Sequence, residues 1–214
     1  MAINLGKFIT IEGPDGAGKS SVVQQLGAYL REAGHEVLIT REPGGNVIAE
    51  QIRHVILDVA NTAMDARTEA LLYAAGRRQH LVENIVPALQ AGKIVICDRF
   101  VDSSLAYQGM ARNIPTDLIW EINQFAVENY LPELTLLIDV PAEVGIARIH
   151  AARTQRQFDR LDQESLEFHT KVRDAFLTFQ QQAPERIQLI DGTQPLEQVV
   201  AACIQVLKEK GIIE

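Results

Sequence analysis

The sequence predicts an α/β fold: a five-stranded parallel sheet with helices on both faces. Two observations carry this prediction. Short apolar runs recur along the chain at residues 8–11, 37–40, 94–97, 134–140 and 187–190. Segments with helical periodicity separate them, and near-continuous apolar strands that alternate with helices are typical of a parallel sheet buried on both sides.

The helical segments follow from apolar residues spaced three and four apart, with glycine or proline at their ends. Gly34 and Gly92 are typical helix stops, and Pro141 is suited to a first helical turn. The predicted helices cover approximately residues 22–30, 66–90, 116–130, a segment that begins at 141, 168–179 and 196–207. Since no repeat, linker or low-complexity tract interrupts this order, we expect one domain over residues 1–214.

Composition narrows the class of protein. The 214 residues are 47% hydrophobic and 22% charged, and 20 basic against 28 acidic residues give a formal charge of −8. An acidic chain argues against nucleic acid as the main partner. No apolar run approaches the roughly 18 residues of a membrane span, and the N-terminus does not resemble a signal peptide. With only Cys97 and Cys203, at no metal-like spacing, we expect a cytoplasmic protein.

Residues 13–20 match the phosphate-loop pattern G-x-x-x-x-G-K-[ST] at every fixed position, between the first strand and the first helix. Glycines let backbone N–H groups surround a phosphate, and the helix N-terminus adds its positive dipole end. Lys19 is expected to reach the β- and γ-phosphates of ATP, and the Ser20 hydroxyl to ligate Mg²⁺. The predicted ATP-binding loop is Gly13, Pro14, Asp15, Gly16, Ala17, Gly18, Lys19 and Ser20. The plainer alternative is a glycine-rich turn.

Other nucleotide-binding classes fit less well. Glu42 ends the second strand as a ribose-binding acid would, but the loop lacks G-x-G-x-x-G. The guanine-reading N-K-x-D of GTP switches is absent, and nothing suggests a motor. Arginine supplies 14 of the 20 basic residues, and its guanidinium makes two-pronged contacts with phosphate. A kinase whose acceptor is itself a phosphate therefore fits best.

Four segments resemble the thymidylate kinase family, in its bacterial form. Residues 98–109 look like its D-R-[YFH]-x-x-S-x-x-A-Y-Q signature, and 40–45, 69–77 and 191–195 resemble its second-strand loop, thymine-pocket helix and adenine-side loop. The blocks occur in the family's order over nearly the whole chain. The resemblance implies a P-loop kinase with an arginine-rich lid. Its expected activity is transfer of the γ-phosphoryl group of MgATP to dTMP for dTTP synthesis, and a homodimer is expected.

The resemblance also implies roles at the acceptor site. Arg99 would hold the acceptor phosphate, and Asp15 would accept a hydrogen bond from the sugar 3′-hydroxyl. Tyr73 would stack on thymine and Arg77 would bond a base carbonyl, although spacing alone favours core packing for Tyr73. Other expected dTMP contacts are Pro43, Arg53, Ser104 at the base edge, Tyr107 against the sugar 2′ position, and Gln108. Arg41 is a weaker candidate, for ordering its loop.

On the donor side, the resemblance implies that Asp98 holds Mg²⁺ together with Ser20. By pattern alone Asp139, which follows another apolar strand, is a rival candidate for the metal. Arg148 and Gln194 would contact ATP. The proposed catalytic residues are Lys19, Arg99, Arg153 and Asp98.

The predicted lid covers approximately residues 148–162. Gly16 stands where family members can carry a phosphate-loop arginine, so the missing cation would come from the lid. Arg153 is the first candidate, before Arg156 and Arg160; Asp159 and Asp162 complete the expected lid set. The alternative is a solvated charged helix.

Two departures from the family pattern are Asn46 in place of threonine and Asp162 in place of glutamate. The five histidines, which show no metal-binding spacing, are interpreted as structural or surface residues. Two other functions stay open: a kinase for another monophosphate or a deoxynucleoside, and a nucleotide-dependent binding switch.

Overall fold

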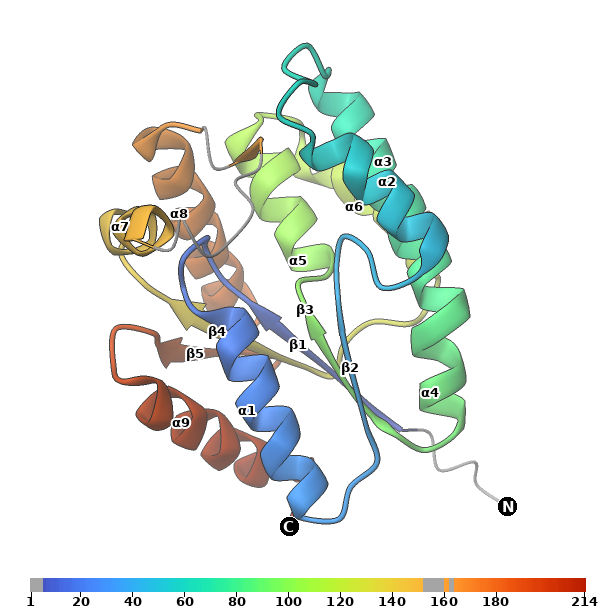
Figure 1. Ribbon diagram of the computed structural model, residues 1–214, viewed down its shortest axis with the longest axis vertical. Coiled ribbons are helices and arrows are strands. Elements are labelled where there is room, and N and C mark those ends of the chain that lie inside the picture. Colours follow the sequence, from blue (N-terminus) through green and yellow to red (C-terminus); the bar gives the residue numbers. More distant parts are fainter. Residues whose placement is uncertain (1–5, 152–159, 162–163) are drawn as a thin grey trace.

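A computed structural model describes residues 6–151, 160–161 and 164–214, and its strands form one parallel sheet (Figure 1). The strand order is β2-β3-β1-β4-β5. The strands are β1 (Lys7–Glu12), β2 (Val37–Arg41), β3 (Ile94–Asp98), β4 (Leu134–Asp139) and β5 (Ile187–Asp191). The predicted fold class is confirmed, and each of the five expected strands is present.

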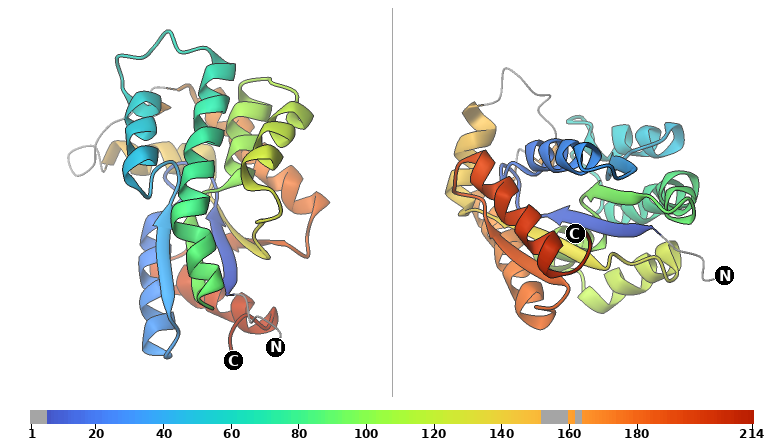
Figure 2. Two further views of the ribbon diagram at one scale, coloured as in Figure 1. Left: turned by 90° about the vertical axis from the view of Figure 1, so that its right-hand side faces the viewer. Right: turned by 90° about the horizontal axis from the view of Figure 1, so that it is seen from below.

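One face of the sheet packs on α1 (Lys19–Glu32) and α9 (Leu196–Glu209) (Figures 1 and 2). The apolar residues that predicted these helices, such as Leu26 on α1 and Cys203 on α9, are fully buried there against Ile9, Ile96 and Leu136. This packing holds α1 against the sheet, with its N-terminus near the end of β1.

The other face packs on helices that carry the 69–77 and 98–109 segments. The expected helix at 66–90 is α3 (Ala66–His80), a π-helical turn η1 (Leu81–Ile85) and α4 (Val86–Gln90) in succession. Beside it lie α5 (Val101–Ser104), the π-helical η2 (Leu105–Ala111), α6 (Thr116–Val127) and α8 (Leu166–Gln182). The shorter α7 (Ala142–Ala151) follows β4 and contacts α8.

Two helical segments were not predicted. The first is α2 (Val47–Leu57), which lies alongside α3 (Figure 1). Ala49, Ile52 and Ile56 lie on its inward face, but Val47 is 74% exposed, so apolar residues alone do not reveal that face in the sequence. The available signal was Asn46, whose side chain caps the helix by accepting a hydrogen bond from the Ala49 amide. The second segment, α5 with η2, is a short helical region within residues 98–109.

Within the described residues, none of the helices has the length and apolarity needed to cross a bilayer. Cys97 and Cys203 are both buried and unpaired by disulfide.

Candidate active site

A cavity of about 480 Å³ opens at the carboxyl ends of β1, β2 and β3, where an open parallel sheet normally binds its ligand. The registers bring these ends to one level, because Asp98 pairs with Ile11 on β1 and with Arg41 on β2. Fifteen of the residues predicted for the site line it. They are Asp15, Gly16, Gly18, Lys19, Ser20, Pro43, Arg53, Tyr73, Arg77, Asp98, Arg99, Ser104, Tyr107, Gln108 and Arg148.

The phosphate loop joins β1 to α1 and forms one wall of this cavity. Gly16 has a φ of 74°, and a Cβ there would lie 2.1 Å from the carbonyl oxygen of Gly145 on α7. Gly13 is constrained in the same way, 2.2 Å from the Ile138 carbonyl. The N-terminal end of α1 faces the cavity. Three residues of the predicted ATP-binding loop do not line it: Gly13, Pro14 and Ala17.

Lys19 is the first residue of α1, and its ammonium group donates to the Pro14 carbonyl oxygen at 2.8 Å. Burial, reinforced by the positive charge of Arg99, lowers the pKa of Lys19 to about 8. An incoming phosphate would reverse this shift by supplying negative charge. A phosphate bound in the cavity would therefore keep the Lys19 side chain in its charged form.

Ser20 and Asp98 form the candidate metal pair. The Ser20 hydroxyl donates to Oδ2 of Asp98 at 2.7 Å, so two hard oxygen ligands face the same point beside the phosphate loop. This donor set suits Mg²⁺, which binds one or two carboxylates together with substrate phosphates. Asp139, the rival candidate, instead accepts two hydrogen bonds of 2.8 Å from Arg173 and is balanced by that charge.

Arg99, Asp15 and Tyr107 form a compact cluster at the phosphate loop, close enough to Lys19 for their charges to interact. Nη2 of Arg99 lies 2.5 Å from Oδ1 of Asp15, and the Tyr107 hydroxyl donates to Oδ2 at 2.8 Å. Burial alone would raise the pKa of Asp15, but the Arg99 and Lys19 charges outweigh it and lower this pKa to about 2. Asp15 is thus an anionic acceptor at the cavity wall at neutral pH.

Arg77 lies at the far end of the cavity and is held by four groups. Its Nε donates to Glu42 at 2.7 Å, and its terminal nitrogens donate to the Ser104 hydroxyl, the Asn123 side chain and the Phe100 carbonyl oxygen. Its side chain is 1% exposed. The guanidinium therefore borders the cavity in a fixed orientation.

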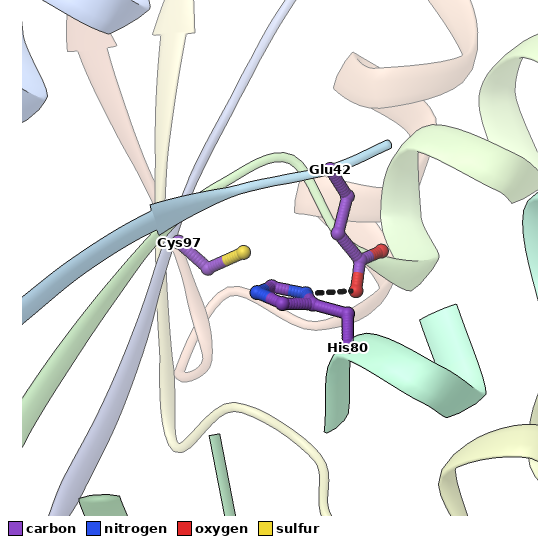
Figure 3. Close-up of side chains that lie close together, drawn as sticks. All are labelled: Glu42, His80 and Cys97. Atoms are coloured by element: carbon purple, nitrogen blue, oxygen red, sulfur yellow. Dashed lines mark hydrogen bonds and ion pairs between the residues drawn. The ribbon is translucent and has the colours of Figure 1, made fainter. Parts of the chain in front are cut away.

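The other oxygen of Glu42 lies 2.9 Å from Nδ1 of His80 (Figure 3). The opposite ring nitrogen of His80 lies 2.6 Å from the Thr40 hydroxyl. Thr40, His80, Glu42 and Arg77 therefore form one chain of buried hydrogen bonds from the end of β2 to α3. The histidines were interpreted as structural or surface residues, and His80 acts through this chain on a cavity residue.

The same picture shows Cys97 beside His80 and Glu42, a grouping with metal-ligand chemistry. A hydrogen-bond network explains it better. Burial and the Glu42 charge raise the pKa of the Cys97 thiol well above its ordinary value, and that thiol donates to the Arg99 carbonyl oxygen. Arg77 already balances Glu42, so a divalent cation would meet a guanidinium in this buried cluster.

The remaining acceptor candidates lie between these two ends. Tyr73 is half-buried and borders the cavity, so it is not the plain core residue that spacing favoured. Arg53 on α2 donates to the Pro43 carbonyl oxygen at 3.0 Å, and Gln108 donates to Glu69 at 2.9 Å.

On the donor side, Arg148 spans two loops. Its Nη1 donates to the carbonyl oxygens of Gly192, at 3.1 Å, and Gly16, at 3.5 Å. Gln194 is hydrogen-bonded to Asp191 in the first of these loops and does not line the cavity.

Most of the predicted lid lies outside the described residues, including Arg153, Arg156, Asp159 and Asp162. Arg160 is described and does not line the cavity. Its guanidinium donates to the Ile56 carbonyl oxygen and forms a buried ion pair with Glu69 on α3. This pair attaches one end of the lid segment to the helix that carries Tyr73 and Arg77.

Sequence reasoning missed Glu12, His80 and Glu69. Each is a buried polar residue that holds a predicted site residue or its neighbour. Glu69 lay in a motif that was recognised, and Glu12 directly precedes the phosphate loop. For Glu12 the only signal was a charged side chain at the end of an apolar run, which does not identify its partner.

A phosphate-loop motif that shares one cavity with the cations Lys19 and Arg99 is suited to two phosphorylated ligands. Fold and site together define a P-loop kinase. A family model described as thymidylate kinase matches residues 11–203. The chain belongs to the thymidylate kinase family.

Curated relatives agree with this assignment. The thymidylate kinase of Latilactobacillus sakei is 58% identical over 209 residues, covering 97% of each chain. That of a Geobacillus species is 52% identical, covering 96% of this chain and 97% of its own. The crystal structure of thymidylate kinase from Ehrlichia chaffeensis superposes with a TM-score of 0.77 at 33% identity, covering 95% of this chain and 98% of that one.

Proposed function

We propose that the chain transfers the γ-phosphoryl group of MgATP to dTMP, giving dTDP and ADP. The observation that carries the proposal is one cavity that is lined by the phosphate loop with Lys19 and, beside it, by Arg99, which hydrogen-bonds to Asp15 of that loop. The acceptor phosphate, with a second pKa of about 6, is already a dianion near neutral pH, so no general base is needed. The task of the enzyme is alignment and neutralisation of charge.

The donor binds on the phosphate-loop side. Lys19 neutralises charge on the β- and γ-phosphates, and Arg148 lies beside the nucleotide between two loops. Ser20 and Asp98 would hold Mg²⁺, which supplies charge neutralisation at the phosphates when it is bound. Arg153, with Arg156 as second candidate, supplies a further cation from the lid; the buried pair with Glu69 makes Arg160 an anchor instead.

The acceptor binds between Arg99 and Arg77. Arg99 grips the phosphate of dTMP, and Asp15 accepts from the sugar 3′-hydroxyl. Tyr73 stacks on the base, while Arg77, Ser104 and Gln108 read its edge. Because the Tyr107 hydroxyl is held by Asp15, its ring stays where a ribose 2′-hydroxyl would need space. Pro43 and Arg53 close the same side of the cavity.

Transfer of isotope from γ-labelled ATP tests this function. With dTMP present, label should appear in dTDP, and Lys19→Ala should lower the rate by several orders of magnitude while circular dichroism shows a retained fold. A switch protein would release labelled phosphate without forming dTDP. Near-normal transfer by folded Lys19→Ala would contradict the assignment.

We further propose that the chain acts as a cytoplasmic homodimer. Phe125 on α6 is 88% exposed and Leu71 on α3 is 57% exposed, and both border an apolar hollow of about 400 Å³ with Ile122. Contiguous exposed apolar surface of this kind is typical of interfaces. Light scattering should give twice the chain mass, and Phe125→Glu should shift it toward the monomer; a monomeric parent would overturn the proposal. The two buried free cysteines suit a reducing compartment.

A further inference from the structure

Glu12, the last residue of β1, has no part in the chemistry described above, although it directly precedes the phosphate loop. Its carboxylate is fully buried. Oε1 accepts from the Phe100 amide at 2.7 Å and more weakly from the Ser103 amide at 3.3 Å, and Oε2 accepts from the Ser103 hydroxyl at 2.5 Å. All of these partners lie in the segment that follows Arg99, where α5 begins at the end of β3 (Figure 1).

The turn held in this way is strained. Arg99 has a φ of 70°, in the left-handed region that residues other than glycine rarely occupy. Such a conformation persists only when its surroundings over-determine it. Two contacts from β1 do so on either side of Arg99: its own amide donates to the Ile11 carbonyl oxygen at 3.0 Å, and the next amide donates to Glu12.

The hydrogen bonds continue to the guanidinium. The Ser103 hydroxyl donates its proton to Glu12 and accepts from Nη1 of Arg99 at 3.0 Å. A single hydroxyl thus connects the buried carboxylate to the cation. Since Ser103 has one proton to give, the direction of both bonds is fixed as long as Glu12 remains an acceptor.

We propose that Glu12 is a positioning residue for the acceptor site: it fixes the turn at Arg99 and, through Ser103, aims the Arg99 guanidinium at the phosphate of dTMP. The inference rests on the proposed role of Arg99. It also explains why a charged residue is buried at this point of β1. The end of β1 then positions both the acceptor-phosphate site, through Glu12, and the ATP-phosphate site, because the phosphate loop starts at the residue after Glu12.

Two variants separate this role from bulk stability. Ser103→Ala removes the link to Arg99 and leaves the amide contacts of Glu12 in place. Glu12→Gln keeps one side-chain oxygen, which can still accept from the Phe100 backbone N–H. Its other terminal atom becomes an NH2 group, which cannot accept from the Ser103 hydroxyl. Each should raise KM for dTMP roughly tenfold or more, the usual worth of a hydrogen bond to a charged group, with KM for ATP changed less than about twofold.

Thr10→Val is the matched control. Thr10 lies on the same strand, is fully buried, and forms a hydrogen bond of 2.8 Å with Thr135 instead of with the Arg99 segment. This variant should lower the thermal midpoint while the ratio of the two KM values stays at the parental value.

Arg99→Ala separates the inference from the role of Arg99 itself. Arg99→Ala should raise KM for dTMP, and adding Ser103→Ala to it should cause no further rise, because the link then has nothing to aim. If Arg99→Ala leaves KM for dTMP unchanged, the proposed acceptor clamp fails and the inference fails with it. If Arg99→Ala is the only variant that raises KM for dTMP, the positioning role of Glu12 is overturned and the clamp stands. The same conclusion follows if Ser103→Ala and Glu12→Gln raise KM for dTMP and KM for ATP equally, as a general defect would.

Discussion

Glu42→Gln should destabilise the protein strongly through Arg77. The two side chains are 3% and 1% exposed, and their ion pair of 2.7 Å is almost fully buried. Even if the His80 imidazole changes tautomer to accept from the new amide, the guanidinium loses the carboxylate that balances it. Removing one partner of a buried pair costs about 3–5 kcal/mol, a large share of a typical stability of about 5–15 kcal/mol.

Glu167→Gln supplies the matched control. Glu167 is 77% exposed and pairs with Lys171 one helical turn away at 2.8 Å, so losing this solvent-screened pair should barely change the free energy of unfolding. Urea unfolding followed by circular dichroism, fitted for midpoint and slope, gives both free energies of unfolding. The reasoning is refuted if Glu42→Gln costs less than about 1 kcal/mol at an unchanged slope, because Arg77 would then not depend on its buried partner.

Three further predictions concern the donor side. The kcat/KM for ATP should fall above pH about 8, because the charged Lys19 is required and its depressed pKa makes the ammonium lose its proton there. The kcat should stay level to higher pH, since bound phosphates raise that pKa; parallel declines would contradict this. Asp98→Asn should raise the Mg²⁺ concentration for half-maximal rate roughly tenfold or more, and an unchanged titration would remove Asp98 from the metal site. Arg153→Ala should lower kcat more than it raises KM for dTMP, since its contact forms in the transition state; parental turnover in both Arg153→Ala and Arg156→Ala would refute the lid role.

The sequence predicted the sheet well because a strand buried on both faces is apolar throughout and needs no partner to be recognised. It missed α2 because exposed Val47 and Val55 stand among the buried Ala49 and Ile56, so the apolar residues surround the helix and hide the face that packs inward. Asn46, noted only as a departure from the family pattern, turned out to be the helix cap.

The site was predictable where chemistry dictates a residue type at a fixed spacing, as in the phosphate loop. It was not predictable where a role depends on a distant partner. Glu12 and Ser103 are 91 residues apart, and Arg160 reaches Glu69 over the same separation. Pattern alone left Asp139 as a rival to Asp98 for the metal. The family resemblance favoured Asp98, and the neighbours of the two residues, Ser20 and Arg173, support that choice.

Specificity constants for dTMP, dUMP, UMP, dCMP and AMP test the central claim most directly. We expect dTMP to be the best acceptor. The compound dUMP should be poorer but active, since a missing methyl group is worth only about 1–3 kcal/mol. UMP should be worse than dUMP, because its 2′-hydroxyl meets the ring of Tyr107, and AMP should fail in a cavity shaped for one ring. If AMP or UMP proved the best acceptor, the proposed base and sugar contacts would be wrong even though the phosphoryl-transfer chemistry survived.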